Sequence, residues 1–364
     1  MSVNINRASQ EWVSRPEDQR FLSLEELKAS VLQRKRESWT ATPRCRDLRV
    51  LPTETQGLVV EAYDPTHGER RQLAPTNWSF GQLAQYAGAP GSYLRKLPAE
   101  LAAINLQWGL EQQPVRDDTL VLAQSNGHHE LRALTSTSYG RIWDHEVVEA
   151  VERVNQSGRW VIPAASYTTT NPRRATTLYA SDRDVFIFLV DPKNPITVGK
   201  DELFRGFYTW NSEVGSAVFG LTTFLYRYVC DNRIIWGATD VRELRIRHTG
   251  GAPERFAYEG QKYLARYAEE SSQKIASTVF AAQNAEIPIN KGKGDTVEGW
   301  LQSRGFTKAQ AKGSVETARA EEGQARSVWD IVNGITAYAR SIANTNDRVD
   351  LEIQAGKLME AVAI

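Results

Sequence analysis

Residues 205–236 read RGFYTWNSEVGSAVFGLTTFLYRYVCDNRIIW, and this stretch decides the fold that we expect. Successive side chains of a strand point to opposite faces of its sheet. From residue 217 to 230 both alternating sets are largely apolar, and Phe224, Tyr226 and Tyr228 place an aromatic stripe on one face. A strand with two apolar faces is expected to be covered on both sides.

The segments around this stretch carry further strand patterns that are separated by short links. The tripeptide DRD at 182–184 lies between TTLYAS and VFIFLV, and a link of this length is typical of a hairpin. Consecutive strands with short links favour an antiparallel meander over a wound parallel sheet. The expected strands of this central part are 159–170, 174–181, 184–190, 203–213, 216–230, 233–237 and 240–248.

Helical patterns and shorter strands flank the central part. Ser23, followed three residues later by Glu26, has the spacing of a capping box and predicts a helix within 16–37. The basic run at 34–36 suits the negative end of that helix dipole. Short strands are expected within 47–64, at 118–125 and at 129–136. Helices are expected in short pieces within 77–113, and at 143–155, 254–285, 296–320, 325–343 and 348–363.

Together these patterns predict an α+β fold, with a central antiparallel β-meander, helices packed on it, and a helical C-terminal region. The glycine pair at 250–251 and the loop NKGKGD at 290–295 are the best candidates for boundaries. The expected domains are an N-terminal helix and β-hairpin segment at 1–75, an α+β core with the antiparallel sheet at 76–250, and a helical C-terminal region at 251–364.

Charge and cysteine content restrict the classes of function. Lys and Arg number 44 and Asp and Glu number 44, so the zero net charge gives no global attraction to nucleic acid. Cys45 and Cys230 are too few for a disulfide framework or a cysteine-based zinc site, and they favour a reducing compartment. The first 20 residues lack the apolar core of a signal peptide, and no run of 18 apolar residues occurs. We therefore expect a cytoplasmic protein without a membrane segment.

Arginines accompany the aromatic side chains of the central part, which leaves two interpretations open. In one, the aromatic residues form a two-sided core and the arginines reach past it to solvent. In the other, the sheet binds single-stranded DNA, because every base offers a π-face for stacking and guanidinium groups pair with phosphates. The candidate phosphate contacts are Arg173, Arg174, Arg205, Arg227 and Arg233. The candidate stacking side chains are Tyr208, Trp210 and Tyr226.

Two triplets combine histidine with carboxylates, HHE at 128–130 and DHE at 144–146. Neither has the i, i+4 histidine spacing of a zinc helix. The chain also lacks the glycine spacing of a phosphate-binding loop and the pattern around a nucleophilic serine or cysteine. We therefore expect no catalytic residue, no metal and no cofactor. A metal enzyme that uses Asp144, His145 and Glu146 is the minor alternative.

Three parts of the sequence carry a family resemblance. They are AGAPGSYLRKLPAELAAINLQWGL, TSTSYGRIWDHEVVEAVERV, and the pair formed by GFYTWNSEVGSAVFGLTTFLYRYVCDNRIIWG and SVWDIVNGITAYARSIANTNDRVDLEIQAGKLMEAVA. Together they resemble the DUF932 family of phage- and plasmid-associated proteins, from about residue 75 to the end of the chain. The resemblance marks a polar cluster as the first place to look for a site: Tyr139, Arg141, Asp144, Asn211, Ser212 and Glu213. For NSEVG at 211–215, a turn or bulge is the alternative interpretation.

The resemblance implies work in DNA replication, recombination or the contest with a bacterial host. Single-strand annealing proteins of the Rad52 and Red-beta type share a broad plan with the central part: an antiparallel sheet, helices behind it, and rings that hold the strand in a basic groove. The first hypothesis is therefore a phage- or plasmid-associated protein that binds or anneals single-stranded DNA as a homo-oligomer. The alternative is a non-enzymatic protein-interaction factor for host takeover, anti-defence or a particle. In that alternative the tail helices bury four side chains against the sheet or a neighbouring subunit: Trp329, Ile331, Ile335 and Tyr338.

Overall fold

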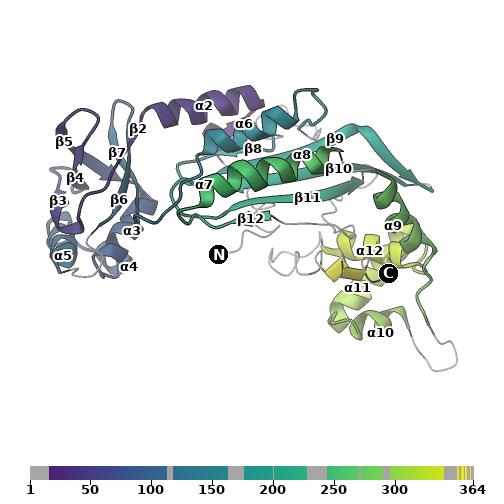
Figure 1. The fold of residues 1–364 in the computed structure, drawn as a ribbon. Helices are drawn as coiled ribbons and strands as arrows, with labels where there is room; N and C mark the ends of the chain where they lie inside the picture. The colour runs from purple at the N-terminus through teal and green to yellow at the C-terminus, as the bar shows by residue number, and fades with distance from the viewer. Residues whose placement is uncertain are drawn as a thin grey trace.

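The computed structural model of the chain describes residues 16–112, 118–162, 176–199, 201–227, 244–269, 272–289 and 296–339, together with residues 351, 354, 355, 357, 358 and 361. Over this part the chain forms two six-stranded sheets, here called sheet A and sheet B, with helices packed on both (Figure 1). A further group of helices follows towards the C-terminus. The expected α+β fold with a helical C-terminal region is confirmed.

Sheet A is the antiparallel meander expected from the central part of the sequence. Its strands, in spatial order, are β1 (Arg20–Phe21), β8 (Leu178–Ala180), β9 (Val185–Val198), β10 (Asp201–Asn211), β11 (Phe219–Arg227) and β12 (Leu244–Ile246). All neighbouring strands pair antiparallel. The hairpin expected around DRD is the β8–β9 connection, in which the Ser181 backbone N–H donates to the Asp184 carbonyl at 2.8 Å. Strand β9 extends past the expected residue 190, because its second half pairs with the start of β10.

Three helices cover one face of sheet A: α2 (Leu24–Arg36), α6 (Asp144–Val154) and α8 (Gln261–Glu269) (Figure 1). Helix α2 begins where the capping box predicts, since the Ser23 hydroxyl accepts from the Glu26 backbone N–H at 3.1 Å. The buried side chains at this face come from the sheet and from all three helices, and they include Leu27, Val31, Val147, Val151, Ile187, Leu189, Phe207 and Leu264. Their burial away from water stabilises this layer of the fold.

The opposite face of sheet A holds the aromatic residues. Tyr179, Phe186, Phe188, Val190, Tyr208 and Trp210 form one cluster, and none of them is more than 3% exposed. Neighbouring rings stack at centroid distances of 5.5–5.9 Å. The Trp210 ring lies over Gly220, where an added Cβ would be only 2.0 Å from a ring carbon. The second face is therefore buried, which favours the two-sided core over a sheet that binds single-stranded DNA on this face.

Sheet B lies in the N-terminal part and was not expected from the sequence as one sheet. Its strands, in spatial order, are β2 (Ser38–Ala41), β6 (Leu120–Ser125), β7 (His129–Thr135), β5 (Glu69–Pro75), β4 (Leu58–Asp64) and β3 (Arg49–Pro52). Strands β5 and β7 pair in parallel, and the other neighbouring pairs are antiparallel. The expected strands at 118–125 and 129–136 are confirmed as β6 and β7.

Helices α3 (Asn77–Tyr86), α4 (Gly91–Leu94) and α5 (Ala99–Glu111) are the short pieces expected within 77–113, and they pack on sheet B. Their apolar residues share one core with the strands, in which Leu73 of β5 joins Leu83 of α3 and Leu106 of α5. This packing crosses the boundary expected between residues 75 and 76. The division into domains at 75 and 250 stays a prediction.

The C-terminal helices form their own core at the far end of the β9–β10 hairpin. The pattern at 254–285 is divided into α7 (Ala252–Arg255), the π-helix η4 (Phe256–Gly260), α8 and α9 (Ser272–Asn284). Helices α10 (Val297–Gln302), α11 (Lys308–Glu322) and α12 (Val328–Ala339) follow. Trp329, Ile331 and Ile335 are buried with Ile196 and Leu203 of the hairpin, so these tail residues pack against the sheet of the same chain.

Some expected elements fall wholly or partly outside the described residues. The strand at 233–237 lies outside them, as does most of the helix at 348–363. The strand at 159–170 is described only to residue 162, and its Val161 forms an isolated bridge with Val190. None of the described helices is long and apolar enough to cross a membrane.

Candidate functional site

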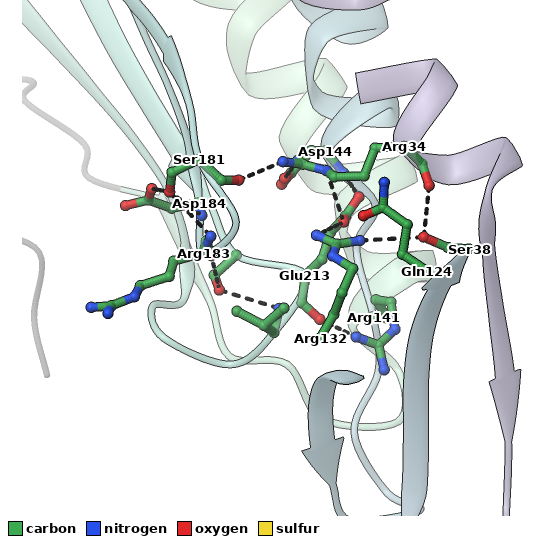
Figure 2. A network of polar contacts seen from close by, with 12 residues as sticks. Arg34, Ser38, Gln124, Arg132, Arg141, Asp144, Ser181, Arg183, Asp184 and Glu213 are labelled. Carbon is green, nitrogen blue, oxygen red and sulfur yellow. Dashed lines mark hydrogen bonds and ion pairs between the residues drawn. The ribbon is translucent and has the colours of Figure 1, made fainter. Parts of the chain in front are cut away.

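A buried group of charges lies where sheet A and sheet B meet (Figure 2). It consists of Arg34, Arg132, Asp144 and Glu213, here called the charged junction. Arg34 comes from the last turn of α2, and Arg132 comes from β7 of sheet B. Asp144 begins α6, and Glu213 follows β10 of sheet A in the turn that Gly215 closes with a positive φ of 84°. The junction therefore joins four segments that are far apart in the sequence.

Asp144 receives polar contacts from two directions. The Arg34 Nη2 atom lies 2.5 Å from its Oδ2, and Asn211 Nδ2 donates to its Oδ1 at 2.8 Å. The same Asn211 amide also donates to the Ile142 carbonyl at 2.8 Å. Asn211 thus ties the end of β10 to the start of α6.

Glu213 is held from sheet B and from α6. Its Oε2 lies 2.8 Å from Arg132 Nη2, and its Oε1 accepts from the Asp144 backbone N–H at 2.9 Å. Arg141 donates to the Glu213 carbonyl. Tyr139 donates its hydroxyl to the Ser212 carbonyl at 2.8 Å. The NSEVG turn is therefore held by side chains of β7 and of the segment that precedes α6, and by the first backbone N–H of α6.

The two carboxyl groups of the junction differ in their acidity. Burial, together with the charge of Glu213, raises the pKa of Asp144 to about 8. Burial would also raise the pKa of Glu213, but the charges of Arg34 and Arg132 lower it below its usual value. The ionised Glu213 and the protonated Asp144 can then lie side by side without two adjacent negative charges, which like-charge repulsion disfavours.

His248 extends the junction through Tyr139. The two rings stack with centroids 5.0 Å apart, and His248 Nδ1 lies 3.0 Å from the Gly140 carbonyl, so Nδ1 carries the donated proton. Its Nε2 atom is buried and has no hydrogen-bond partner among the residues that the structure describes. Burial lowers the pKa of His248 to about 4, against the effect of the Gly140 bond. The ring is therefore neutral at physiological pH.

The contacts of the charged junction indicate a structural role, which is to hold the two sheets together. Arg34 contacts Asp144 and Arg132 contacts Glu213, and all four side chains are buried or nearly so. No group of three metal-ligating side chains occurs among the described residues. The triplet at 144–146 does not converge, since Asp144 faces Arg34 while Glu146 accepts from the Trp143 backbone N–H at the start of α6. The metal-enzyme alternative gains no support from this geometry.

A second candidate site is an open groove of about 640 Å³ between α6 and the η4–α8 segment, here called the α6–α8 groove. Alanines of both helices line it, and Trp160 lies buried beside it. Its cations are Arg153, Arg159 and Lys262, against one carboxylate, that of Glu269. Arg159 is already paired with Asp191 at 2.5 Å. Arg153 and Lys262 are exposed, so they supply the accessible positive charge.

Tyr258 adds an aromatic surface to the α6–α8 groove. Its side chain is 65% exposed, and Lys262 Nζ lies 3.7 Å from the ring centroid. The hydrogen bond and the charge of Lys262 lower the pKa of the Tyr258 hydroxyl. A cation over the face of an exposed aromatic ring is a cation–π pair, which keeps the lysine next to the ring.

The structure places the sequence-predicted stacking residues in the core. Tyr208 and Trp210 are each 2% exposed, and Arg205 is 4% exposed, so none of them presents a surface to a DNA strand. This corrects their proposed contact role for the structure described, because a base must reach a ring face to stack on it. Tyr226 and Arg227 belong to β11, but their side chains are outside the described part. Arg173, Arg174 and Arg233 are outside it entirely.

The polar cluster marked by the resemblance is brought together as one network. Tyr139, Arg141, Asp144, Asn211, Ser212 and Glu213 all take part in the contacts above. The NSEVG segment forms the turn that its alternative interpretation expects, and its part in a functional site stays a prediction. Sequence reasoning missed Arg34 and Arg132. Arg34 was accounted for by the helix dipole, and Arg132 carries no local signal in its strand. Sequence reasoning also missed the α6–α8 groove, whose residues form no motif.

Comparison with known proteins gives a family but no activity. No curated protein and no solved structure matches the chain. A family model described as "Domain of unknown function (DUF932)" matches residues 133–355. This match covers more than half of the chain and includes Asp144 and Glu213 of the charged junction. The chain therefore belongs to the DUF932 family.

Proposed function

We propose that the chain binds single-stranded DNA, and that the α6–α8 groove is the contact site. The observation that carries this proposal is the exposed Tyr258 ring beside Lys262 and Arg153 in an open groove. Proteins that bind single strands combine a positive groove along the backbone with aromatic side chains on which bases stack. The groove offers both elements on one surface.

The roles of the groove residues follow from their exposure and charge. Tyr258 supplies the ring on which a base stacks. Lys262 and Arg153 contact phosphates as exposed cations, while Arg159, held by Asp191 and the Ala268 carbonyl, shapes the wall of the groove. Neutral net charge is compatible with this role because the cations are gathered locally. The affinity is then modest and depends strongly on salt.

The architecture supports the same proposal at a coarser level. Three long antiparallel strands, β9 to β11, carry helices on one face, which is the plan expected for single-strand annealing proteins of the Rad52 and Red-beta type. This is an analogy of fold, and a fold alone does not determine function. In this proposal the protein acts in recombination or replication of a phage or plasmid, as a homo-oligomer in the bacterial cytoplasm.

The test is a fluorescence anisotropy titration of a labelled 40-nucleotide single strand at low salt. Tyr258→Ala should weaken binding by about 5- to 150-fold, the range for loss of one stacked base. Lys262→Ala should make the slope of log K against log salt shallower by about 0.7, as expected for one lost phosphate contact on a single strand. Tyr93→Ala and Lys312→Ala are matched controls, because both side chains are exposed on elements away from the groove.

Two outcomes would overturn the DNA proposal. One is the absence of binding at micromolar protein and low salt. The other is binding that Tyr258→Ala and Lys262→Ala leave unchanged relative to the two controls, which would move the site elsewhere.

A second candidate function is a non-enzymatic protein-interaction factor, and the exposed apolar side chains of α5 favour it. Trp329 is buried at 2% exposure, so it holds the C-terminal core together and is no contact for a partner. Trp108, at 66% exposure, is the better residue to test. Affinity capture from host lysate should lose an identified partner with Trp108→Ser and keep it with Phe280→Ser, an exposed aromatic position on α9.

A further inference from the structure

The outer face of α5 presents three large apolar side chains to solvent. Leu101, Ile104 and Trp108 are 49%, 63% and 66% exposed. Their spacing of three and four residues places them on one side of the helix. The other side of α5 belongs to the core of sheet B through Ala103 and Leu106. Adjoining exposed apolar side chains of this size are characteristic of an interaction surface.

We propose that this face of α5 binds the same face of a second copy of the chain, with the two helices antiparallel. Ile104 lies close to the midpoint between Leu101 and Trp108 along α5. A two-fold axis at that point sets Leu101 of one copy opposite Trp108 of the other and brings the two Ile104 side chains together. The pattern is therefore self-complementary, as a two-fold interface requires.

The charges at the two ends of α5 fit the same arrangement. Exposed Arg95 and Lys96 precede the helix, and Glu100 is the acidic residue of its first turn. Glu111 stands at the other end, and the last turn has no basic residue. Antiparallel packing brings Glu111 near the net positive end of the second copy and sets the helix dipoles in opposition. Parallel packing would place ends of like charge together.

The self-association goes beyond the proposed DNA function and is separable from it. Helix α5 packs on sheet B, whereas the α6–α8 groove lies among the helices of sheet A. A variant of one surface therefore leaves the other intact. Failure of DNA binding does not affect the α5 contact, and failure of the α5 contact does not remove the groove.

Sedimentation velocity over a hundredfold range of protein concentration tests the proposal. The wild-type chain should pass from monomer to dimer, and Ile104→Asp should remain a monomer at the concentration where the wild type is dimeric. Phe280→Ser is the matched control, since it removes an exposed aromatic side chain from α9 and should keep the dimer. Thermal melting of each variant verifies that it is folded.

Cysteine pairing then tests the orientation. In a Cys230→Ser background, a mixture of Leu101→Cys and Trp108→Cys chains should form the mixed disulfide under mild oxidation. Leu101→Cys alone should not crosslink to itself, which a parallel pair would do. The remaining native cysteine, Cys45, is buried and serves as the unreactive background.

Three results would overturn the proposal. They are a wild-type monomer at every concentration, a dimer that survives Ile104→Asp, and self-crosslinking of Leu101→Cys without the mixed product. A monomeric wild type that captures a host protein through Trp108 would assign this face to a different protein instead.

Discussion

Arg132 on β7 of sheet B holds its Nη2 atom 2.8 Å from Oε2 of Glu213, which follows β10 of sheet A. Both side chains are at most 2% exposed, so this ion pair is shielded from water at the place where the sheets meet. A buried pair stabilises a fold only while both partners are present, because either charge alone is costly in the interior. The pair thus makes the contact between the sheets depend on two particular residues.

Removal of Arg132 should destabilise the protein strongly. Arg132→Met leaves the Glu213 carboxylate buried opposite an apolar group, and the expected loss is about 3–5 kcal/mol in the free energy of unfolding. Urea unfolding followed by tryptophan fluorescence measures it. Arg44→Met removes the guanidinium of an exposed pair with Asp47 and should cost less than about 1 kcal/mol. Equal losses of unfolding free energy in Arg132→Met and Arg44→Met would contradict a stabilising role of the Arg132–Glu213 pair. The double variant Arg132→Met/Glu213→Leu should recover part of the loss.

Acidification should destabilise the protein through His248. Its pKa in the folded state is lowered to about 4, whereas the unfolded side chain titrates near 6.5. The unfolded state therefore binds more protons between these values, and stability falls as the pH drops from 6.5 to 4. The contribution is about 3 kcal/mol for a pKa difference of this size. In His248→Gln the fall over this pH range should be smaller than in the wild type, and an unchanged fall would remove His248 as its source.

The titration of Asp144 should give stability the opposite dependence on pH. Its pKa is raised to about 8, so the folded state keeps a proton that the unfolded state releases near pH 4. Stability from this group is greatest in acid and declines as the pH rises from 4 to 8. Asp144→Asn, which keeps an uncharged amide at this position, should flatten the decline in urea unfolding between pH 6 and 8. A variant that leaves the decline unchanged would show that Asp144 is already ionised in the folded state throughout this range.

The contact between Trp210 and Gly220 predicts the result of a small substitution. Gly220→Ala places a methyl group where the indole ring now lies, and overpacking of this kind costs about 1–3 kcal/mol. Thermal melting should show the loss as a lower Tm. Gly81→Ala in α3 is the control, because an added Cβ there has no heavy atom within 4 Å and a helix favours Ala over Gly. The control should keep or raise Tm.

Local signals made the helices and the meander predictable. The Ser23 cap and the DRD hairpin each depend on residues within a few positions of one another. Sheet B was harder, because β5 has the sequence ERRQLAP with Leu73 as its one buried residue, and its parallel partner β7 is more than 50 residues away. Parallel pairing leaves no hairpin signal in the sequence.

The candidate sites show the same limit. The resemblance pointed to Asp144 and Glu213, and the structure brings them together. It could not supply Arg34 or Arg132, because a long-range ion pair has no periodicity or spacing. Tyr208 and Trp210 were predicted to stack on DNA bases, because the sequence pattern of an aromatic stripe is the same whether a base or the chain itself covers the rings. Burial, which distinguishes these cases, appears only in three dimensions.

The first strand of sheet A has a consequence for synthesis on the ribosome. Strand β1 emerges early, yet its partner β8 lies about 160 residues later, and all of sheet B is made in between. The nascent chain can complete sheet B before the meander has been synthesised. Until then, β1 lacks its partner strand and α2 lacks the sheet face on which it packs. A fragment that begins at residue 133, where the family match starts, would lack Arg34 and the apolar side chains of α2, and would expose to water the part of sheet A and α6 that α2 covers.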